Sequence, residues 1–265
     1  MRLPVRFWRT AWYLNEGLLM TDVHVSPPPA LRRALDLLAD PPADPDVSKG
    51  YLDLLSTARD ETIPKNTGPI QAAWASPIGS MLYDNAQALS RRLINAWQHP
   101  VEWLNIPQGG TALDVGSGPG NITSSLARAA GPDGLALGVD ISKPMLARAV
   151  RNEAGPQVGF IRADAQRLPL RDNTIDAVVS LAVLQLIPNP ASALAEIARV
   201  LRPGGRLAIM VPTAGRAARL WQKLPNVGAH AFGDDEIGDI LEDTGFASVR
   251  VNTVGTLQWV RGKNG

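Results

Sequence analysis

Residues 111–120, which read Thr-Ala-Leu-Asp-Val-Gly-Ser-Gly-Pro-Gly, constrain the fold of this chain more than any other stretch. The first half is a short apolar run, which predicts a strand buried on both faces. Glycine then occupies every second position, at Gly116, Gly118 and Gly120, which permits positive φ angles and lets a ligand contact bare backbone. Residues 121–130 read as a helix whose first amides point back at this turn. We therefore expect the first strand of an α/β sheet, followed by a ligand-binding turn.

The charge next to this turn indicates what it binds. Dinucleotide-binding turns space their glycines as G-x-G-x-x-G and place a pyrophosphate on the helix N-terminus. Here the spacing is G-x-G-x-G, and Asp114 precedes the first glycine. Two unit charges about 4 Å apart interact by roughly 4 kcal/mol at an effective dielectric constant near 20, so a carboxylate here disfavours a phosphate. We expect a positively charged ligand; an ordinary turn with a solvated aspartate is the alternative.

Composition narrows the function further. The 265 residues are 45% hydrophobic, enough for one large domain with an attachment, and 26 basic side chains nearly balance 25 acidic ones. That balance provides no general field for nucleic acid, so we expect a small-molecule substrate and no nucleic-acid partner. Cysteine is absent, which excludes thiolate chemistry and is compatible with the cytoplasm. The three histidines, His24, His99 and His230, lack the spacing of a zinc site, so we expect no metal.

Three regions follow one another along the chain. Residues 1–48 form an amino-terminal extension that ends in a proline-rich linker, and residues 30–38 within it are helix-sized. Residues 1–20 mix Trp, Leu and Arg at helical spacing, which predicts weak contact with a membrane surface; the alternative is that translation begins at Met20. Residues 49–105 contain several predicted helices and form a helical cap segment, and residues 106–265 form the ligand-binding domain.

The large domain alternates short apolar runs with helices, which predicts right-handed β-α-β units. We expect a Rossmann-like, seven-stranded, mostly parallel sheet, an antiparallel hairpin at its carboxyl end and an amino-terminal helical extension. The second strand, residues 135–139, ends at Asp140, where a carboxylate can accept bonds from two ribose hydroxyls. Ser142 is the better N-cap for the helix over 144–152, so we expect Asp140 to be free for the ligand.

Several elements in order resemble one family. They are the glycine turn with Asp114, the acidic strand tip Asp140, a third acidic position at Asp164, and the turn Leu-Arg-Pro-Gly-Gly at 201–205. Over about residues 78–261 the chain resembles the class I S-adenosylmethionine-dependent methyltransferases, in particular the ubiquinone/menaquinone biosynthesis (type 11) group. The resemblance implies S-adenosyl-L-methionine as cofactor, with its ammonium and sulfonium charges. The implied binding residues are Asp114, Gly116, Ser117, Gly118, Gly120, Asp140, Ile141, Asp164, Ala165 and Leu181.

Individual roles also come from the resemblance. Asp164 and Ala165 would meet the adenine, and Leu181 would flank the cofactor. Relatives often carry histidine where this chain has Gln185, which cannot act as a general base near neutral pH and leaves hydrogen bonding as its role. Tyr83-Asp84 resembles a Tyr-Asp pair ahead of the glycine turn in relatives. We take three residues as catalytic candidates: Tyr83, Gln185 and His230.

The turn at 201–205 is assigned a structural role, because Gly204 and Gly205 permit a left-handed helix end and a tight reversal. The expected activity is methylation of a small hydrophobic metabolite, such as a quinone, polyketide or lipid precursor. A cofactor-binding regulator or inactive homologue is the alternative. Enzymes that methylate nucleic-acid amino groups usually carry Asn/Asp-Pro-Pro-Tyr/Phe after the fourth strand, where residues 180–183 read Ser-Leu-Ala-Val. We expect a cytoplasmic protein that contacts the membrane only peripherally.

Overall fold

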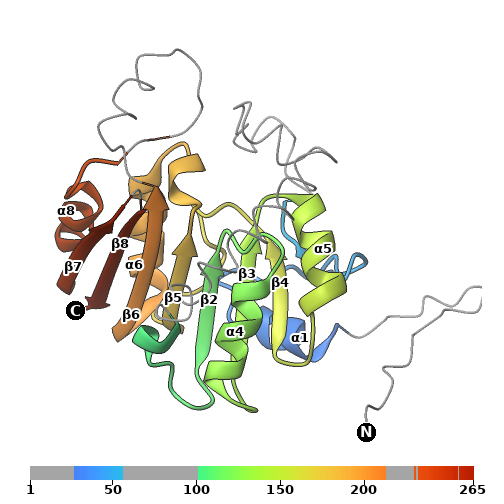
Figure 1. The fold of residues 1–265 in the computed structure, drawn as a ribbon. Coiled ribbons are helices and arrows are strands. Elements are labelled where there is room, and N and C mark those ends of the chain that lie inside the picture. The colour runs from blue at the N-terminus through green and yellow to red at the C-terminus, as the bar shows by residue number, and fades with distance from the viewer. Residues whose placement is uncertain (1–26, 56–100, 213–229, 231, 256) are drawn as a thin grey trace, which may run out of the picture.

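An eight-stranded sheet forms the centre of the molecule (Figure 1). The computed structural model describes residues 27–55, 101–212, 230, 232–255 and 257–265. The strands occur in the spatial order β1-β4-β3-β2-β5-β6-β8-β7, and all neighbours are parallel except those that involve β8. Their bounds are Leu52–Asp53 (β1), Thr111–Val115 (β2), Leu135–Asp140 (β3), Val158–Arg162 (β4), Ile175–Leu181 (β5), Leu201–Pro212 (β6), Phe246–Val254 (β7) and Leu257–Asn264 (β8).

Helices cover the two faces of the sheet unequally. One face packs against α4 (Asn121–Ala130) and α5 (Lys143–Glu153), and the other against α1 (Pro29–Leu35), α6 (Pro190–Val200) and α8 (Glu236–Asp243). Because side chains alternate along a strand, each strand contributes to the cores on both faces. In β2, Leu113 points toward the side of α1 and α6, and Ala112 points toward α4. The central strands are buried on both faces, as the sequence predicts.

Most predicted elements are confirmed. The helix predicted over 121–130 is α4, and the strand predicted over 135–139 is β3, which is one residue longer. The closing hairpin is β7 and β8, which pair antiparallel as predicted. Gly245 follows α8 with φ 95°, the left-handed conformation expected after a helix.

The predicted strand number is wrong by one, because residues 52–53 form an extra edge strand. This strand, β1, lies within the segment predicted to be helical and pairs parallel with β4. A buried ion pair anchors it, in which Arg162 Nη1 donates to Asp53 Oδ1 at 3.0 Å. Arg162 Nε also donates to the carbonyl of Ile141. Residues before the large domain are thus integrated into the same sheet, and α1 packs into its core.

The turn at 201–205 is also different from the prediction. Helix α6 ends at Leu201, which is extended (φ −70°, ψ 135°), so no left-handed helix end occurs here. Residues 202–205 instead bulge out of β6, since Ile175 pairs with Leu201 and Ala177 with Arg206. Gly204 has φ 80° within this bulge. Among helices in the described ranges, none combines the length and apolarity that a bilayer crossing requires.

Candidate cofactor site

The glycine turn after β2 is built by positive φ angles and close contacts. The angles are 76° at Gly116, 50° at Gly118 and 88° at Gly120, as the sequence predicts. A Cβ at Gly116 would lie 2.2 Å from a methyl of Val183, and one at Gly120 would lie 2.6 Å from the ring of Phe160. Nothing lies within 4 Å of a Cβ at Gly118. The first and last glycines are therefore required for packing as well as for conformation.

Asp114 lies beneath this turn instead of facing a ligand. It is 3% exposed, and its Oδ2 accepts a 2.7 Å hydrogen bond from Thr123 Oγ1 of α4. Burial raises the pKa of Asp114 to about 7, and the nearby charge of Asp140 adds to the shift, while the bond from Thr123 opposes it. The sequence argument assumed a fixed negative charge at this position; the structure makes that charge sensitive to pH and to a neighbouring cation.

Asp140, at the tip of β3, is held by two backbone amides. Its Oδ2 accepts from the amide of Gly118 and its Oδ1 from the amide of Ser142, both at 2.8 Å. Ser142 occupies the N-cap position of α5, but its side chain makes no capping bond. Ser142 is thus the N-cap residue, as predicted, and Asp140 lines the pocket while it also accepts these two amides. Each carboxylate oxygen accepts one of these bonds and has a second lone pair for a ligand.

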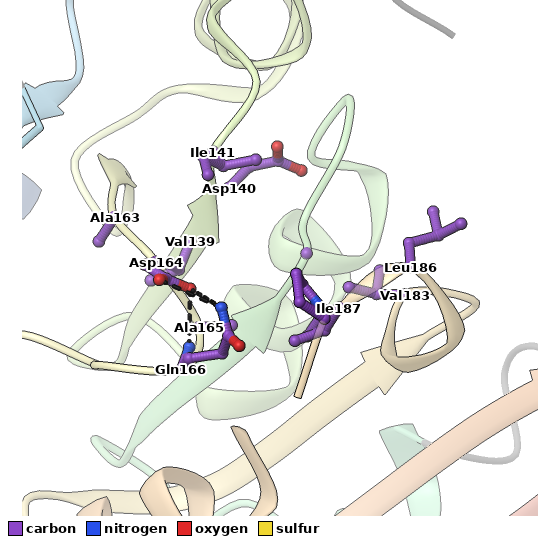
Figure 2. Close-up of a pocket in the computed structure, with 12 residues that line it drawn as sticks. Val139, Asp140, Ile141, Ala163, Asp164, Ala165, Gln166, Val183, Leu186 and Ile187 are labelled. Carbon is purple, nitrogen blue, oxygen red and sulfur yellow. Dashed lines mark hydrogen bonds between the residues drawn. The ribbon is translucent and has the colours of Figure 1, made fainter. Parts of the chain in front are cut away.

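A pocket opens at the carboxyl ends of β2, β3 and β4 (Figure 2). Five of the predicted residues line it, and the sequence reasoning had not assigned the other seven to the cofactor. The lining residues are Gly116, Val139, Asp140, Ile141, Ala163, Asp164, Ala165, Gln166, Val183, Leu186, Ile187 and Pro188. The rule that ligands lie at the carboxyl ends of parallel strands could have identified Val139 and Ala163.

Gln166 connects the two sides of this pocket. Asp164 Oδ1 accepts from the Gln166 amide at 2.9 Å, and Gln166 Nε2 reaches the same carboxylate at 3.2 and 3.3 Å (Figure 2). Gln166 Oε1 in turn accepts from the amide of Asn189, the N-cap residue of α6. The Asp164 loop is thereby fastened to the segment that follows β5.

The loop after β5 supplies an apolar side of the pocket. It begins at Ala182, whose φ of 57° is uncommon for a residue with a Cβ and marks a local strain. The 3₁₀ turn η1 (Leu184–Leu186) follows, and Val183 packs against Gly116. Leu181 was predicted to flank the cofactor, but it is absent from the pocket lining and packs against the α4-side core. Ser117 does not line the pocket either, and its Cβ lies close to Gly138.

Of the three catalytic candidates, the two that the structure describes, Gln185 and His230, do not line the pocket. Tyr83 lies outside the described residues. Gln185 is absent from the lining, and its Nε2 donates back to the carbonyl of Ala182 at 2.8 Å. The backbone amide of His230 donates to the carbonyl of Gln185 at 2.7 Å, and His230 Nε2 lies 2.6 Å from Glu236 Oε1. Gln185 and His230 are therefore neighbours, next to the pocket wall rather than on it.

In the described ranges, no group of three or more His, Asp or Glu side chains is arranged to hold a metal ion. The two pocket carboxylates, Asp140 and Asp164, bind backbone amides and the Gln166 side chain instead. A ligand of this pocket would meet hydrogen-bond acceptors on one side and apolar side chains on the other.

Residues 113–209 match the family Methyltransf_11, described as a methyltransferase domain. These residues run from β2 into β6 and include every residue that lines the pocket. Over residues 113–209 the chain therefore carries a methyltransferase domain, and it is similar there to S-adenosylmethionine-dependent methyltransferases and to the ubiquinone/menaquinone methyltransferases.

Two curated relatives show how far the similarity extends. The chain is 42% identical over 108 residues to a demethylmenaquinone methyltransferase of Bacillus licheniformis, a match that covers 40% of this chain and 47% of that protein. It is 38% identical over 132 residues to a 2-phytyl-1,4-naphtoquinone methyltransferase of Thermosynechococcus vestitus, which covers 49% of this chain and 59% of that protein. The chain thus spans about half the length of the curated relatives it matches.

Solved structures agree on the fold. The complex between the Haloferax volcanii Trm112 methyltransferase activator and a putative methyltransferase matches with a TM-score of 0.61 at 19% identity, covering 74% of this chain and 97% of that one. A SAM-dependent methyltransferase from Aquifex aeolicus matches with a TM-score of 0.52 at 27% identity, covering 63% of this chain and 88% of that one.

Proposed function

We propose that this protein transfers a methyl group from S-adenosyl-L-methionine to a small hydrophobic acceptor, such as a quinone, polyketide or lipid precursor. The observation that carries the proposal is the charge of the pocket. Two carboxylates, Asp140 and Asp164, line it, and no Lys or Arg does. A pyrophosphate would find no counter-charge there, whereas a ligand with positive charges and free hydroxyls fits both the charge and the acceptors.

Particular residues are suited to hold this cofactor. The remaining lone pairs of Asp140 can accept the two ribose hydroxyls. We expect Asp164 and Ala165, which line the pocket, to meet the adenine, and Ile141 and Ile187 provide apolar lining. Asp114, buried under the glycine turn, adds negative potential near the cationic end of the ligand. When bound, the cofactor supplies an electrophilic methyl group on a positively charged sulfur.

The chain's contribution to methyl transfer is chiefly alignment and exclusion of water. Val183, Leu186 and Ile187 present apolar side chains on the pocket wall. None of the lining residues is a His, Lys or Tyr that could remove a proton. We infer that activation of the acceptor depends on Tyr83, on His230 or on the acceptor's own acidity.

The acceptor class is proposed from two sources. The matched relatives are named as methyltransferases of demethylmenaquinone and of a phytyl naphthoquinone. The amino-terminal residues 1–20, rich in tryptophan and arginine, add a predicted membrane-surface contact that suits a lipid-soluble acceptor. We propose a cytoplasmic location from the absence of cysteine.

Two measurements test the proposal. Calorimetry should detect binding of S-adenosylmethionine and S-adenosylhomocysteine and no binding of NAD at the same concentration. Incubation with methyl-labelled cofactor and a lipid extract should then place label in an organic-soluble product, with the Asp140→Ala variant as the control. Binding of NAD alone would refute the cofactor assignment. Cofactor binding with no label in any organic-soluble product would refute the acceptor class.

The alternative is a cofactor-binding regulator or inactive homologue, and one observation favours it. Neither Gln185 nor His230 reaches the pocket lining, and the two carboxylates among the described lining residues, Asp140 and Asp164, already accept backbone amides. Tight cofactor binding without methylation of any member of a broad panel of acceptors would support this alternative.

A further inference from the structure

At the hairpin end of the sheet, one face of β7 and β8 carries exposed side chains in the described part of the chain, and the Trp103 ring lies against it at Arg261. Along β8, Gln258 and Val260 are buried toward α8, whereas Arg261 and Lys263 on the opposite side are exposed. Strand β7 repeats the pattern, with Val251 packed on the core and its neighbours exposed. Figure 1 shows these strands at the opposite end of the sheet from α5. We call this surface, on the side away from α8, the open hairpin face.

One end of the open hairpin face is cationic. Its four cations are Arg206, Arg250, Arg261 and Lys263, and the strand register places Arg206 opposite Lys263 and Arg250 opposite Arg261. Strands β6, β7 and β8 contain no Asp or Glu, and the adjoining segment 101–104 carries one carboxylate, Glu102. Within the described part of the chain, no ion pair involves these four cations.

An aromatic ring holds two of these cations without neutralising them. The guanidinium carbons of Arg206 and Arg261 each lie 4.8 Å from the centre of the Trp103 ring. Arg206 Nη1 also donates to the Trp103 carbonyl at 2.8 Å. The arrangement fixes positive charge at the surface and leaves it available to an anion.

The other end of the open hairpin face is apolar. Val254 is 61% exposed, and Leu257 pairs with it across the hairpin. Trp259 follows on the same side of β8. Pro212 pairs with Leu257, so this end lies at the carboxyl end of β6, the edge of the sheet on which the cofactor pocket opens. At about 3.3 Å per residue, roughly 13 Å separate Leu257 from Arg261.

We propose that the open hairpin face docks on an anionic lipid surface. The apolar end enters the boundary between headgroups and acyl chains, Trp259 lies at headgroup depth, and the cations further along the strands lie in the negative surface potential of the anionic headgroups. Along β8 the surface changes from apolar to cationic, in the same order as the environment changes from acyl chains to headgroups and water. Docking in this orientation turns the pocket edge of the sheet toward the membrane. The inference goes beyond the proposed function and does not require methyl transfer.

Vesicle sedimentation with the full chain tests this docking. Vesicles of phosphatidylcholine and phosphatidylglycerol in equal parts should bind the protein, and vesicles of phosphatidylcholine alone should not. Joint substitution of Arg250→Glu and Lys263→Glu should weaken binding by at least about 30-fold, because losing each cation near an anionic surface costs about fivefold and each new carboxylate adds repulsion. Val254→Asp should weaken it by about tenfold.

The matched control is Arg32→Glu with Arg151→Glu, which reverses the same number of charges on exposed positions of α1 and α5. This control should bind vesicles within twofold of the unchanged protein. The docking is overturned if the hairpin variants bind as well as the unchanged protein or if the control loses as much. Binding to a single-stranded polynucleotide but not to vesicles overturns it as well. Circular dichroism and cofactor calorimetry on each variant verify that the fold and the pocket are intact.

Discussion

The parallel part of the sheet and the hairpin at its end obey different constraints. Strands β2, β3 and β4 are covered by helices on both faces and consist of buried residues, whereas β7 and β8 bury one face and expose the other. The covered part carries the glycine turn and the pocket, where an added methyl group at Gly116 or Gly120 would clash with neighbouring side chains. The hairpin is free to carry surface charge. The cofactor site thus lies where helices pack on both faces of the sheet, and the proposed docking surface lies where one face carries exposed side chains.

The two regions also have opposite charge. The pocket is lined by Asp140 and Asp164 without a cation, and the three hairpin-end strands contain cations without a carboxylate. A net charge of +1 over the chain conceals this separation. Local fields, and not the overall balance, decide which ligands each region attracts.

The largest difference between the regions should appear in core packing. Leu113→Ala in β2 removes a fully buried side chain and should lower the free energy of unfolding by about 2–5 kcal/mol. Val254→Ala in β7 removes a side chain that is already exposed and should change it by less than about 0.5 kcal/mol. Urea denaturation of both variants measures the contrast. Equal losses would show that the hairpin is packed as tightly as the centre.

A second contrast concerns two glycines with positive φ. Gly116→Ala adds a Cβ 2.2 Å from a methyl of Val183 and also strains the backbone. It should lower the free energy of unfolding by about 2–4 kcal/mol and abolish cofactor binding. Gly255→Ala in the hairpin turn has φ 62° and no atom within 4 Å of the new Cβ, so only the strain of about 1 kcal/mol remains. Denaturation and calorimetry distinguish the two. Cofactor binding by the Gly116 variant would contradict the pocket assignment.

The buried carboxyl of Asp114 predicts a pH dependence that the hairpin cations do not. Because its pKa is raised to about 7, the folded protein binds more protons than the unfolded chain between about pH 4 and 7. Stability from this group is therefore lost as the pH rises through that window. Asp114→Asn removes the cost of ionisation and should exceed the unchanged protein in stability at pH 8 by up to about 4 kcal/mol, with little difference at pH 4.

Cofactor affinity should change with pH in the direction opposite to stability. A cationic ligand favours the ionised form of Asp114, so the unchanged protein should bind S-adenosylmethionine more tightly at pH 8 than at pH 6. Asp114→Asn should bind weakly and without this dependence. Calorimetry at the two pH values measures both, and an unchanged affinity in the variant would show that Asp114 has only a structural role.

The smallest effect is expected at Gln185, between the two regions. Gln185→Ala removes one bond to the carbonyl of Ala182, so stability should fall by about 0.5–1 kcal/mol. Cofactor affinity should stay within twofold, because Gln185 does not line the pocket. A tenfold loss of cofactor affinity, measured by calorimetry, would place Gln185 in the cofactor site after all.

Patterns local in sequence predicted most of the sheet. Glycine spacing, strand-ending aspartates and hydrophobic periodicity identified β2 to β4, α4 and the pocket residues Gly116, Asp140 and Asp164, because each depends on neighbours along the chain. Strand β1 escaped prediction because two residues are too short for a pattern, and its place depends on the distant partner Arg162. Leu181 does not line the pocket but packs against the core on the α4 side, a placement that depends on contacts distant in sequence.

By itself, the sequence determined the fold class, the methyltransferase resemblance and the edge of the sheet at which a ligand binds, since backbone conformation and hydrophobic periodicity are encoded by adjacent residues. Only the tertiary structure decided how the charged groups behave. It buried Asp114 under α4, tied Asp140 to two amides and left four cations on the open hairpin face. Desolvation and hydrogen bonding are set by whatever packs nearby in space, and nothing local in the chain specifies those neighbours.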